Sequence, residues 1–388
     1  MKQGWTYKKV GDVFKTYSGG TPIKSHKEYY ENGDIPWIRS GEVCRKYITE
    51  SEMFITQAGL ENSSAKFFPV DTVLVAMYGA TAAQVGILKI RATSNQAVCG
   101  ILPNENFIPE FVYYWFKLIE SDLASQAQGG AQPNISQEKI KKVEFPIISL
   151  SEQERIVERL DAAFAQIDEL KSNAEKQLAE ARALFQSALK EMLEPKEGWV
   201  EKKMSDLYDV RDGTHDSPKY HETGYPLVTS KNLRGGILDM SNVSLISEED
   251  YKAINIRSKV DIGDVLFAMI GTIGNPVYVQ TEPNYAIKNM ALFKVPPTQS
   301  GEFLRYYLLN NNVLLKMQNE SKGTTQKFVS LGYLRNFLVR IPNLSEQQQL
   351  VSRLDSLKSN VDRLQENFTK ITQECDALKQ ALLRQIFE

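Results

Sequence analysis

Residues 150–170 read LSEQERIVERLDAAFAQIDEL and residues 344–364 read LSEQQQLVSRLDSLKSNVDRL, so one stretch occurs twice, 194 positions apart. In both copies, apolar residues recur at alternating steps of three and four, the pattern of a coiled-coil helix. In the second copy the pattern continues from Leu350 to Leu382, which is more than four heptads. The sequence therefore predicts two long helices, over residues 151–197 and 344–388.

The apolar seam of the first helix is less regular than that of the second. It contains Ile156, Leu170 and Leu184, but the polar residue Gln177 falls at a seam position. Several of its other seam residues are alanines, which allow a partner helix to approach closely. The sequence predicts a seam that is interrupted at Gln177.

The helix ends carry recognisable signals. Ser151 with Glu154, and Ser345 with Gln348, have the spacing of a capping box, in which two side chains pair with free backbone amides. Pro195 predicts the end of the first helix, because proline lacks an amide proton and its ring clashes with the preceding turn.

Sequence repeats extend over the whole chain. GWTYKKVGDVF at Gly4 matches GWVEKKMSDLY at Gly198, and FPVDTVLVAMYGAT at Phe68 matches VDIGDVLFAMIGTI at Val260. We therefore predict two copies of one unit, each a globular head followed by a helix, with heads at residues 1–150 and 198–343. Because the seams match, the helices are expected to pack as an antiparallel coiled coil, and the first helix would separate the heads by roughly 60 Å.

Each head is predicted to be α+β with mostly antiparallel strands. In the first head, strands are expected at Val73–Met77, Val85–Ile90 and Val98–Leu102, and short helices at Glu110–Ile119 and Gln137–Lys142. Stacking on bases is one interpretation of the aromatic run Phe111–Phe116. A buried helix explains it better, because its counterpart at residues 303–308 is largely apolar and does not keep the tryptophan.

Composition is that of an ordinary globular protein, with 42% hydrophobic residues, 24% charged residues and a net charge of −2. The heads are slightly basic, with 16 basic and 15 acidic side chains in residues 1–150 and 17 and 15 in residues 198–343. The helical segments are acidic, so contact with DNA is expected from the heads. With no signal peptide or membrane segment expected, the sequence favours a cytoplasmic protein.

Motifs for catalysis are missing from the sequence. It contains no GxxxxGK[ST] phosphate loop, GxGxxG turn, HExxH pair or GxSxG elbow. It also lacks an NPPY-like tetrapeptide of the kind that holds a flipped adenine. The three cysteines, Cys44, Cys99 and Cys375, lack paired spacing, so neither disulfides nor a metal site is predicted. The sequence predicts no catalytic residue.

Two related heads, each followed by a helix that opens LSEQxxxVxRLD, resemble the specificity subunit of type I restriction–modification enzymes. The resemblance covers essentially the whole chain and includes SGGTP at Ser18, IPW at Ile35 and DGTHDSPKY at Asp212. It implies that each head is a target recognition domain that reads half of an asymmetric, bipartite double-stranded DNA site. It also implies that the helical rod sets the spacing of the half-sites and docks two methyltransferase (modification) subunits.

The resemblance further implies that the subunit itself is not an enzyme and binds no cofactor. S-adenosylmethionine, ATP and Mg would be bound by partner subunits, and restriction subunits would join through the complex. No membrane partner is implied.

Candidate DNA-binding residues are polar or glycine residues in turns. Glycines allow the backbone to approach phosphates closely, and Arg and Asn pair with the edges of guanine and adenine. In the first head they are Ser18, Gly19, Gly20, Thr21, Arg39, Ser40, Gly79, Thr81 and Gln132. In the second head they are Asp212, Gly213, Thr214, His215, Lys231, Asn232, Arg234, Gly271, Thr272, Gln326 and Lys327. Ordinary tight turns and solvated loops would explain the same residues.

Two other classes of function stay open at this point. A protein-interaction scaffold would use the heads and helices to bind proteins only. A self-contained methyltransferase or nuclease is disfavoured by the missing motifs. Binding to duplex DNA with a steep dependence on salt would separate the first class from DNA recognition.

Overall fold

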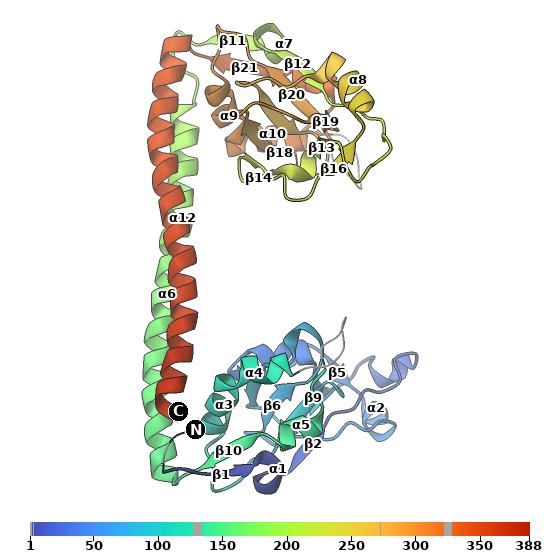
Figure 1. Cartoon of the computed structure of the whole chain (residues 1–388), viewed down its shortest axis with the longest axis vertical. Coiled ribbons are helices and arrows are strands. Elements are labelled where there is room, and N and C mark those ends of the chain that lie inside the picture. The colour runs from blue at the N-terminus through green and yellow to red at the C-terminus, as the bar shows by residue number, and fades with distance from the viewer. Residues whose placement is uncertain (1, 3, 127–133, 272, 322–327) are drawn as a thin grey trace. The chain divides into compact units, whose positions relative to one another are not determined.

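The computed structural model describes residues 2, 4–126, 134–271, 273–321 and 328–388 (Figure 1). Contacts divide the chain into two compact units. Unit 1 contains residues 1–173 and 369–388, and unit 2 contains residues 174–368. The division therefore falls within both long helices, and each unit takes one part of each helix.

Unit 1 is built on a five-stranded sheet of order β2-β9-β6-β7-β4, beside a three-stranded sheet of order β5-β3-β8 and the pair β1-β10. The strands are β1 (Thr6–Lys9), β2 (Thr16–Ser18), β3 (Ile35–Ile38), β4 (Tyr47–Ile48), β5 (Phe54–Ile55), β6 (Val73–Ala76), β7 (Val85–Leu88), β8 (Thr93–Ser94), β9 (Val98–Ile101) and β10 (Glu144–Ile147). Most neighbours are antiparallel, as predicted; β3 with β8 and β4 with β7 are parallel.

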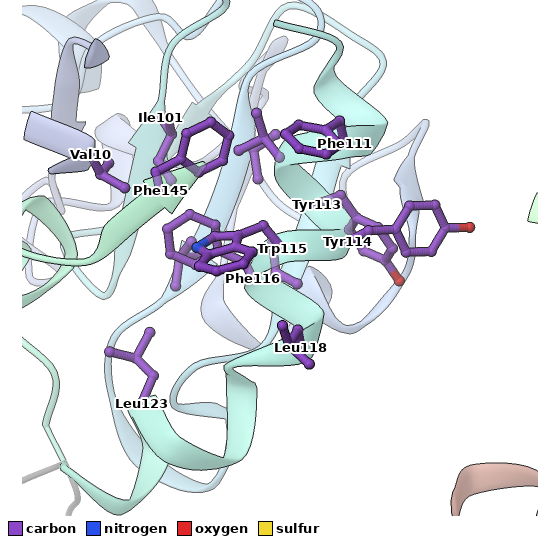
Figure 2. Packing of buried hydrophobic residues seen from close by; sticks show 14 of the residues in the cluster. Val10, Ile101, Phe111, Tyr113, Tyr114, Trp115, Phe116, Leu118, Leu123 and Phe145 are labelled. Atoms are coloured by element: carbon purple, nitrogen blue, oxygen red, sulfur yellow. The ribbon is translucent and has the colours of Figure 1, made fainter. Parts of the chain in front are cut away.

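The shorter helices of unit 1 are α1 (Val10–Val13), η1 (Lys27–Tyr29), η2 (Ser40–Cys44), α2 (Gln57–Glu61), η3 (Gly79–Thr81), α3 (Pro109–Leu118), α4 (Glu120–Ser125) and α5 (Gln137–Lys141). Helix α3 contains the aromatic run, and Phe111–Phe116 are all buried. Phe111 and Trp115 pack edge-on to Phe145 of β10, with ring centroids 5.8 and 6.3 Å apart (Figure 2). The run is thus a core helix, as expected.

Unit 2 repeats this plan with a four-stranded sheet of order β12-β20-β17-β18, a three-stranded sheet of order β16-β13-β19 and two pairs, β11-β21 and β14-β15. The strands are β11 (Val200–Lys203), β12 (Asp209–Asp212), β13 (Tyr225–Thr229), β14 (Leu233–Arg234), β15 (Ile237–Leu238), β16 (Ser244–Ile246), β17 (Val265–Ala268), β18 (Gly274–Tyr278), β19 (Ala286–Lys288), β20 (Met290–Lys294) and β21 (Leu338–Ile341). The shorter helices are α7 (Met204–Leu207), η4 (Ser230–Asn232), α8 (Glu248–Ser258), α9 (Gly301–Leu309), α10 (Asn311–Asn319) and α11 (Leu331–Asn336).

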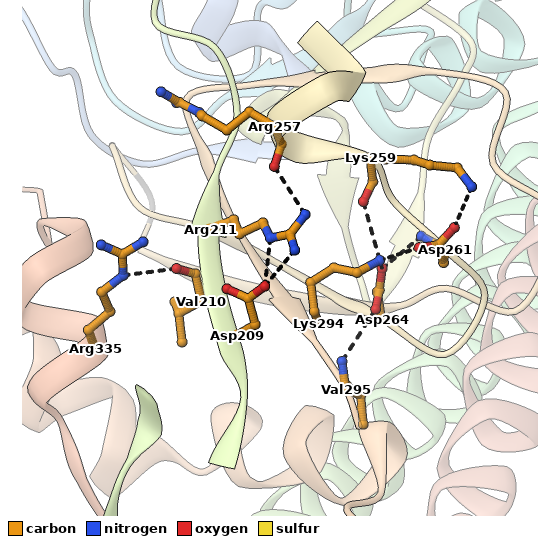
Figure 3. A network of polar contacts seen from close by, with 10 residues as sticks. All are labelled: Asp209, Val210, Arg211, Arg257, Lys259, Asp261, Asp264, Lys294, Val295 and Arg335. Carbon is orange, nitrogen blue, oxygen red and sulfur yellow. Dashed lines mark hydrogen bonds and ion pairs between the residues drawn. The ribbon is translucent and has the colours of Figure 1, made fainter. Parts of the chain in front are cut away.

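Register confirms that the two units are copies of one fold. Val73 of β6 lies opposite Ile101 of β9, and Val265 of β17 lies opposite Phe293 of β20. One difference is a polar network around β20, in which Lys294 Nζ lies 2.5 Å from Asp264 Oδ2 (Figure 3). The corresponding position before β6 is held by Thr72, whose hydroxyl donates to the carbonyl of Pro69 at 2.8 Å. The same fold thus tolerates an ion pair or a hydroxyl at this position.

The long helices are α6 (Leu150–Met192) and α12 (Leu344–Phe387), which lie side by side in each unit (Figure 1). In unit 1, Lys379 is paired with Asp168, and Lys171 Nζ lies 3.5 Å from Asp376 Oδ1. Residue numbers in these pairs rise along α6 as they fall along α12, so the helices are antiparallel, as the sequence predicted. In unit 2, Arg182 donates to Gln365.

The predicted capping residues are wrong by two positions. Ser149 Oγ accepts a hydrogen bond from the amide of Glu152 at 3.3 Å, and Asn343 Oδ1 accepts from the amide of Glu346 at 3.0 Å. Each helix therefore begins before the Ser-Glu-Gln sequence rather than within it. The residues in the capping positions are Ser149 and Asn343.

The seam of α6 also differs from the prediction. Leu170 and Leu184 are 54% and 71% exposed, whereas Leu178 and Phe185 are buried. The seam therefore continues through Leu178, and Gln177 is not an interruption of it. The buried residues Ile167, Leu178 and Leu189 are spaced by eleven, which corresponds to about 3.67 residues per turn rather than the 3.5 of a heptad.

The glutamine of each LSEQ stretch ties a long helix to its unit. Gln153 Oε1 accepts from the amide of Ile108, the residue before α3, at 2.9 Å. Gln347 Oε1 accepts from the amide of Ser300, the residue before α9, at 3.0 Å. Both glutamines are fully buried. The repeated sequence is thus explained in part by one repeated contact between a long helix and a sheet-covering helix.

Candidate nucleic-acid interface

The turn at residues 18–21 uses its glycines for close packing. A Cβ atom on Gly19 would lie 2.2 Å from Ser94 Oγ, and one on Gly20 would lie 2.1 Å from the amide nitrogen of Ala65. The two amides donate to the carbonyls of Val98 and Ser94 at 3.0 and 2.8 Å. Both amides are therefore already bonded within the protein, and contact of Gly19 or Gly20 with DNA stays a prediction.

The hydroxyls of the same turn are also partnered. Ser18 Oγ donates to Gln137 Oε1 at 2.9 Å, and Thr21 Oγ1 donates to Gln96 Oε1. Thr21 is half-buried and leads into an exposed segment, which begins after Pro22. Contact of Ser18 or Thr21 with DNA stays a prediction.

The equivalent turn of unit 2 is held by a polar cluster. A Cβ atom on Gly213 would lie 2.4 Å from the carbonyl oxygen of Ile287, and the Thr214 amide donates to that carbonyl at 3.0 Å. His215 Nδ1 lies 2.8 Å from Asn289 Oδ1, and His215 Nε2 lies 2.9 Å from Asp212 Oδ2. Both ring nitrogens thus face oxygen atoms, which suits the doubly protonated imidazolium.

Electrostatics of this cluster follow from its hydrogen bonds. The contacts with Asn289 and then with Asp212 raise the pKa of His215 above its usual value. Arg257 Nη2 lies 2.8 Å from the other oxygen of Asp212, and it acts in the opposite direction on that pKa. The arrangement places an arginine and an ionisable histidine next to a glycine turn on an exposed surface. Positive groups in such a place are suited to bind phosphate.

The loop after β3 in unit 1 is braced by carboxylates. The Arg39 amide donates to Glu42 Oε2 at 2.7 Å, and the Arg39 guanidinium is paired with Glu52. Glu42 Oε1 also accepts from the amide of Glu52 at 2.8 Å. Ser40 begins η2 and is half-buried. Contact of Arg39 with DNA stays a prediction, and it requires that the guanidinium first separate from Glu52.

Asn232 stands in unit 2 where Glu42 stands in unit 1, and it is a buried structural residue. Asn232 Oδ1 accepts from the Thr229 amide at 2.9 Å, while Nδ2 donates to the carbonyls of Asp239 and Asn242 at 2.9 and 3.1 Å. The amide group is therefore saturated inside the protein. The prediction that Asn232 pairs with a base is corrected, since its side chain supports the loop instead.

A groove of about 890 Å³ collects the remaining candidates of unit 2. It is lined by Tyr220, Leu227, Thr229, Ser230, Lys231, Asn232, Arg234, Asp239, Ser241, Asn242, Val243, Ser244, Ile270, Gly271 and Asn289. Lys231 and Arg234 are exposed in it. Arg234 Nε donates to the Lys231 carbonyl at 3.0 Å, and its Nη1 lies 3.7 Å from Asp239. The structure thus brings Lys231, Arg234 and Gly271 together on one polar concave surface.

Several residues of this groove were missed by the sequence prediction. The segment Asp239–Ser244 enters the groove because Asn232 holds its carbonyls. Asn289 reaches it from the turn before β20, with φ of 55°. The left-handed backbone at Asn289 can be recognised only when the turn itself is known. Sequence patterns alone therefore did not place Asn289 in the groove.

The glycine loops after β6 and β17 have special backbone geometry. Gly79 has φ of 74° with open space at its Cβ position, and Gly271 has φ of 77°. Thr81 Oγ1 donates to the carbonyl of Tyr78 at 3.3 Å. The space beside Gly79 is open enough for a phosphate to approach. Contact of Gly79, Thr81 or Gly271 with DNA stays a prediction. The candidates Gln132, Thr272, Gln326 and Lys327 lie outside the described residues.

The described residues show neither a cluster of metal ligands nor a helix suited to cross a membrane. Within the described ranges, no group of three or more His, Cys, Asp or Glu side chains could hold a metal ion. The helices in the described part of the chain lack the combination of length and hydropathy that a membrane crossing requires.

Comparison with known proteins gives a consistent result. The family model "Type I restriction modification DNA specificity domain" matches residues 2–180 and again residues 196–373. Over 160 residues, the chain is 32% identical to the specificity subunit of the Escherichia coli type I restriction enzyme EcoR124I/EcoR124II, which is 40% of each chain. It is 26% identical over 409 residues to the specificity subunit of the Methanocaldococcus jannaschii type I restriction enzyme MjaIX, covering 97% of this chain and 92% of that relative.

The fold is similar to that of a chain solved to explain complex assembly and conformational transition of the type I R-M system. The TM-score is 0.76 at 18% identity, with 100% of this chain and 98% of that chain covered. The two family matches together cover most of the sequence, one for each copy of the repeat. This chain therefore belongs to the type I restriction–modification DNA specificity domain family.

Proposed function

We propose that this chain is the DNA-sequence-recognition subunit of a type I restriction–modification complex and that it is not itself catalytic. Each unit reads one half of an asymmetric, bipartite site in double-stranded DNA. The observation that carries the proposal is the tandem family match, since each copy of a DNA specificity domain coincides with one copy of the repeated head. The groove also supports the proposal, because it places the positive side chains of Lys231 and Arg234 on one concave surface.

The two long helices have a second role in this proposal. Helix α6 is continuous over 43 residues, so its length limits how far apart the half-sites can lie. The half-exposed or exposed leucines Leu170, Leu184, Leu357 and Leu378 on α6 and α12 offer apolar contacts for two methyltransferase subunits. Restriction subunits join through the complex.

Cofactors belong to the partners in this proposal. S-adenosylmethionine would be bound by the methyltransferase subunits, and ATP and Mg by the complex that cleaves DNA. The present chain contributes recognition and positioning. We place the complex in the cytoplasm, where its DNA substrate lies.

The test is to co-express the chain with its methyltransferase subunits and map methylated adenines in cellular DNA. A split motif with two defined halves and unspecified bases between them is expected. The purified complex should also bind a duplex with this motif, and its affinity should fall steeply with salt. A complex that binds proteins but shows no sequence preference for DNA would make this chain a protein scaffold instead.

A further inference from the structure

Each unit contains a tyrosine that connects a sheet-covering helix to a long helix. In unit 1, the hydroxyl of Tyr114 in α3 donates to Asp161 Oδ1 in α6. In unit 2, the hydroxyl of Tyr306 in α9 donates to Asp355 Oδ1 in α12 at 2.5 Å. Asp161 and Asp355 are the aspartates of the two LSEQxxxVxRLD stretches. Burial first, and then the hydrogen bond to aspartate, raise the pKa of both phenols, which therefore stay protonated donors.

The cation that completes this pair comes from different places in the two units. In unit 2 it is Arg305, the neighbour of Tyr306 in α9, whose Nη2 lies 3.3 Å from Asp355 Oδ1. In unit 1, the place of Arg305 is taken by Tyr113, and the cation is Lys46. Lys46 Nζ is paired with Asp161 and lies 3.1 Å from the hydroxyl oxygen of Tyr114.

Aromatic rings enclose the Lys46 ammonium. Its Nζ lies 4.8 Å from the ring centre of Tyr114, 5.0 Å from that of Tyr47 and 5.9 Å from that of Tyr113. Figure 2 shows the hydroxyls of Tyr113 and Tyr114 on the side of α3 that faces away from Phe145. An ammonium over aromatic faces and next to a carboxylate is held by several interactions at once.

Lys46 closes the loop that contains the first candidate base-reading residues. That loop runs from Arg39 through η2 to Lys46, and the carbonyl of Lys46 accepts from the amide of Ile87 in β7 at 2.8 Å. One end of the loop is braced by Glu42 and Glu52, as described above. The other end is fixed to α6 through the Lys46 side chain.

The corresponding loop of unit 2 closes on itself. Asn232 binds the carbonyls of Asp239 and Asn242, and Arg234 binds the carbonyl of Lys231. The hairpin tip is Gly235–Gly236, two exposed or half-exposed glycines with φ of 59° and 82°. The hydrogen bonds and ion pairs of the described side chains in this loop stay within the loop. At the position that corresponds to Lys46, unit 2 has this glycine tip instead of a lysine.

We infer that Lys46 is a positioning residue that fixes the recognition loop of unit 1 to helix α6, and that the corresponding loop of unit 2 makes no such connection through its described residues. This inference rests on the proposed function. Displacement of the Asp161 carboxylate by a partner or a substitution should therefore change how the first half-site is read. The second half-site should be read independently of Asp355.

The experiment compares Lys46→Met with Arg305→Met in the complex with the methyltransferase subunits. Both changes remove a partly buried cation from a Tyr–Asp pair, so general loss of stability would affect both. The probe is a set of duplexes that carry the mapped site, each with one base changed in the first or second half. Discrimination against wrong bases in the first half should fall about five- to tenfold in Lys46→Met only. Lys46→Arg should restore it, and Arg305→Met should change neither half.

Asp161→Asn cuts the same connection from the helix side and provides a second variant if Lys46→Met does not fold. It should reproduce the defect in the first half-site. Equal discrimination by wild type, Lys46→Met and Asp161→Asn, or equal losses in both half-sites, would overturn the role of Lys46. A wild-type complex without any sequence preference would instead overturn the proposed function.

Discussion

Gln153 and Gln347, 194 residues apart, make the same contact in the two units, each accepting a hydrogen bond from the amide before a sheet-covering helix. Their Nε2 atoms donate to carbonyls as well, Gln153 to Asn106 and Ile148 and Gln347 to Pro342, all at 3.0 Å. A buried glutamine with all of these bonds made fixes where the long helix meets the sheet. Loss of this side chain leaves several buried polar groups without partners.

We expect Gln153→Met to destabilise unit 1 by about 1–3 kcal/mol, because methionine has nearly the same shape but cannot pair with the Ile108 amide. Gln347→Met should do the same to unit 2. Urea denaturation followed by tryptophan fluorescence measures the effect. The matched control is Gln177→Met, an exposed site on α6, which should change stability by no more than about 0.5 kcal/mol. If Gln153→Met and Gln347→Met were as stable as the control Gln177→Met, the buried glutamines would not be what holds the long helices to their units.

The Asp264–Lys294 pair gives a test based on the internal repeat. Asp264 is 3% exposed, so Lys294→Leu leaves a buried carboxylate without its cation and should cost about 3–5 kcal/mol. Unit 1 has Thr72 and Leu102 at the corresponding positions. The double variant Asp264→Thr/Lys294→Leu should therefore be more stable than Lys294→Leu alone. A double variant less stable than the single one would mean that the two units are not interchangeable here.

The histidine cluster predicts a dependence on pH. Because the pKa of His215 is raised above 6.5, its charged contacts stabilise unit 2 fully below pH 6.5, and this contribution is lost as pH rises through the raised pKa. NMR titration of the imidazole should show this pKa. Asp212→Asn should lower it, whereas Asp216→Asn, next to His215 but not bonded to its ring, should leave it nearly unchanged. An unchanged titration in Asp212→Asn would remove Asp212 as a cause.

We propose that Arg234, rather than Asn232, reads bases in unit 2. Arg234→Ala should lower discrimination at one position of the second half-site by about 1–3 kcal/mol while the fold remains intact. Asn232→Ala should instead lower the stability of unit 2, because the carbonyls of Asp239 and Asn242 lose their donor. Binding to single-base variants of the mapped site, measured beside thermal unfolding, separates the two effects. Full discrimination by Arg234→Ala would place this arginine outside the base contacts.

The repeat, the two helices and their antiparallel pairing could be predicted from sequence because they depend on local patterns and their recurrence. The seam of α6 was misplaced at Gln177 because heptad and eleven-residue spacings differ by only one residue over a few turns. Gly19 and Gly213 looked like phosphate-binding turns, yet glycine is needed there for the close approach of Ser94 and Ile287. Local sequence does not distinguish these two reasons for glycine.

Contacts between distant residues were beyond the sequence prediction. Lys46 and Asp161 are 115 positions apart, and nothing in the sequence near either residue indicates the other. Asn232 has the chemistry of a base-reading residue, and only its four hydrogen bonds in the folded loop show that it is occupied. Burial of a polar group depends on the whole fold, which is why this part of the candidate site had to come from the structure.

The last prediction concerns helix length. The variant carries four extra residues after Arg182 in α6 and four after Gln365 in α12, because these two residues contact each other. The insertions add roughly 6 Å to both helices and keep the pairing on either side. This position avoids Leu178, which is buried directly after Gln177. At ~3.4 Å per base pair, the added length equals about two base pairs. The methylated motif should keep both halves and gain unspecified bases between them, whereas alanine substitution of four exposed residues at the same level, without added length, should leave the motif unchanged. An active insertion variant with the original spacing would show that helix length does not set the distance between half-sites.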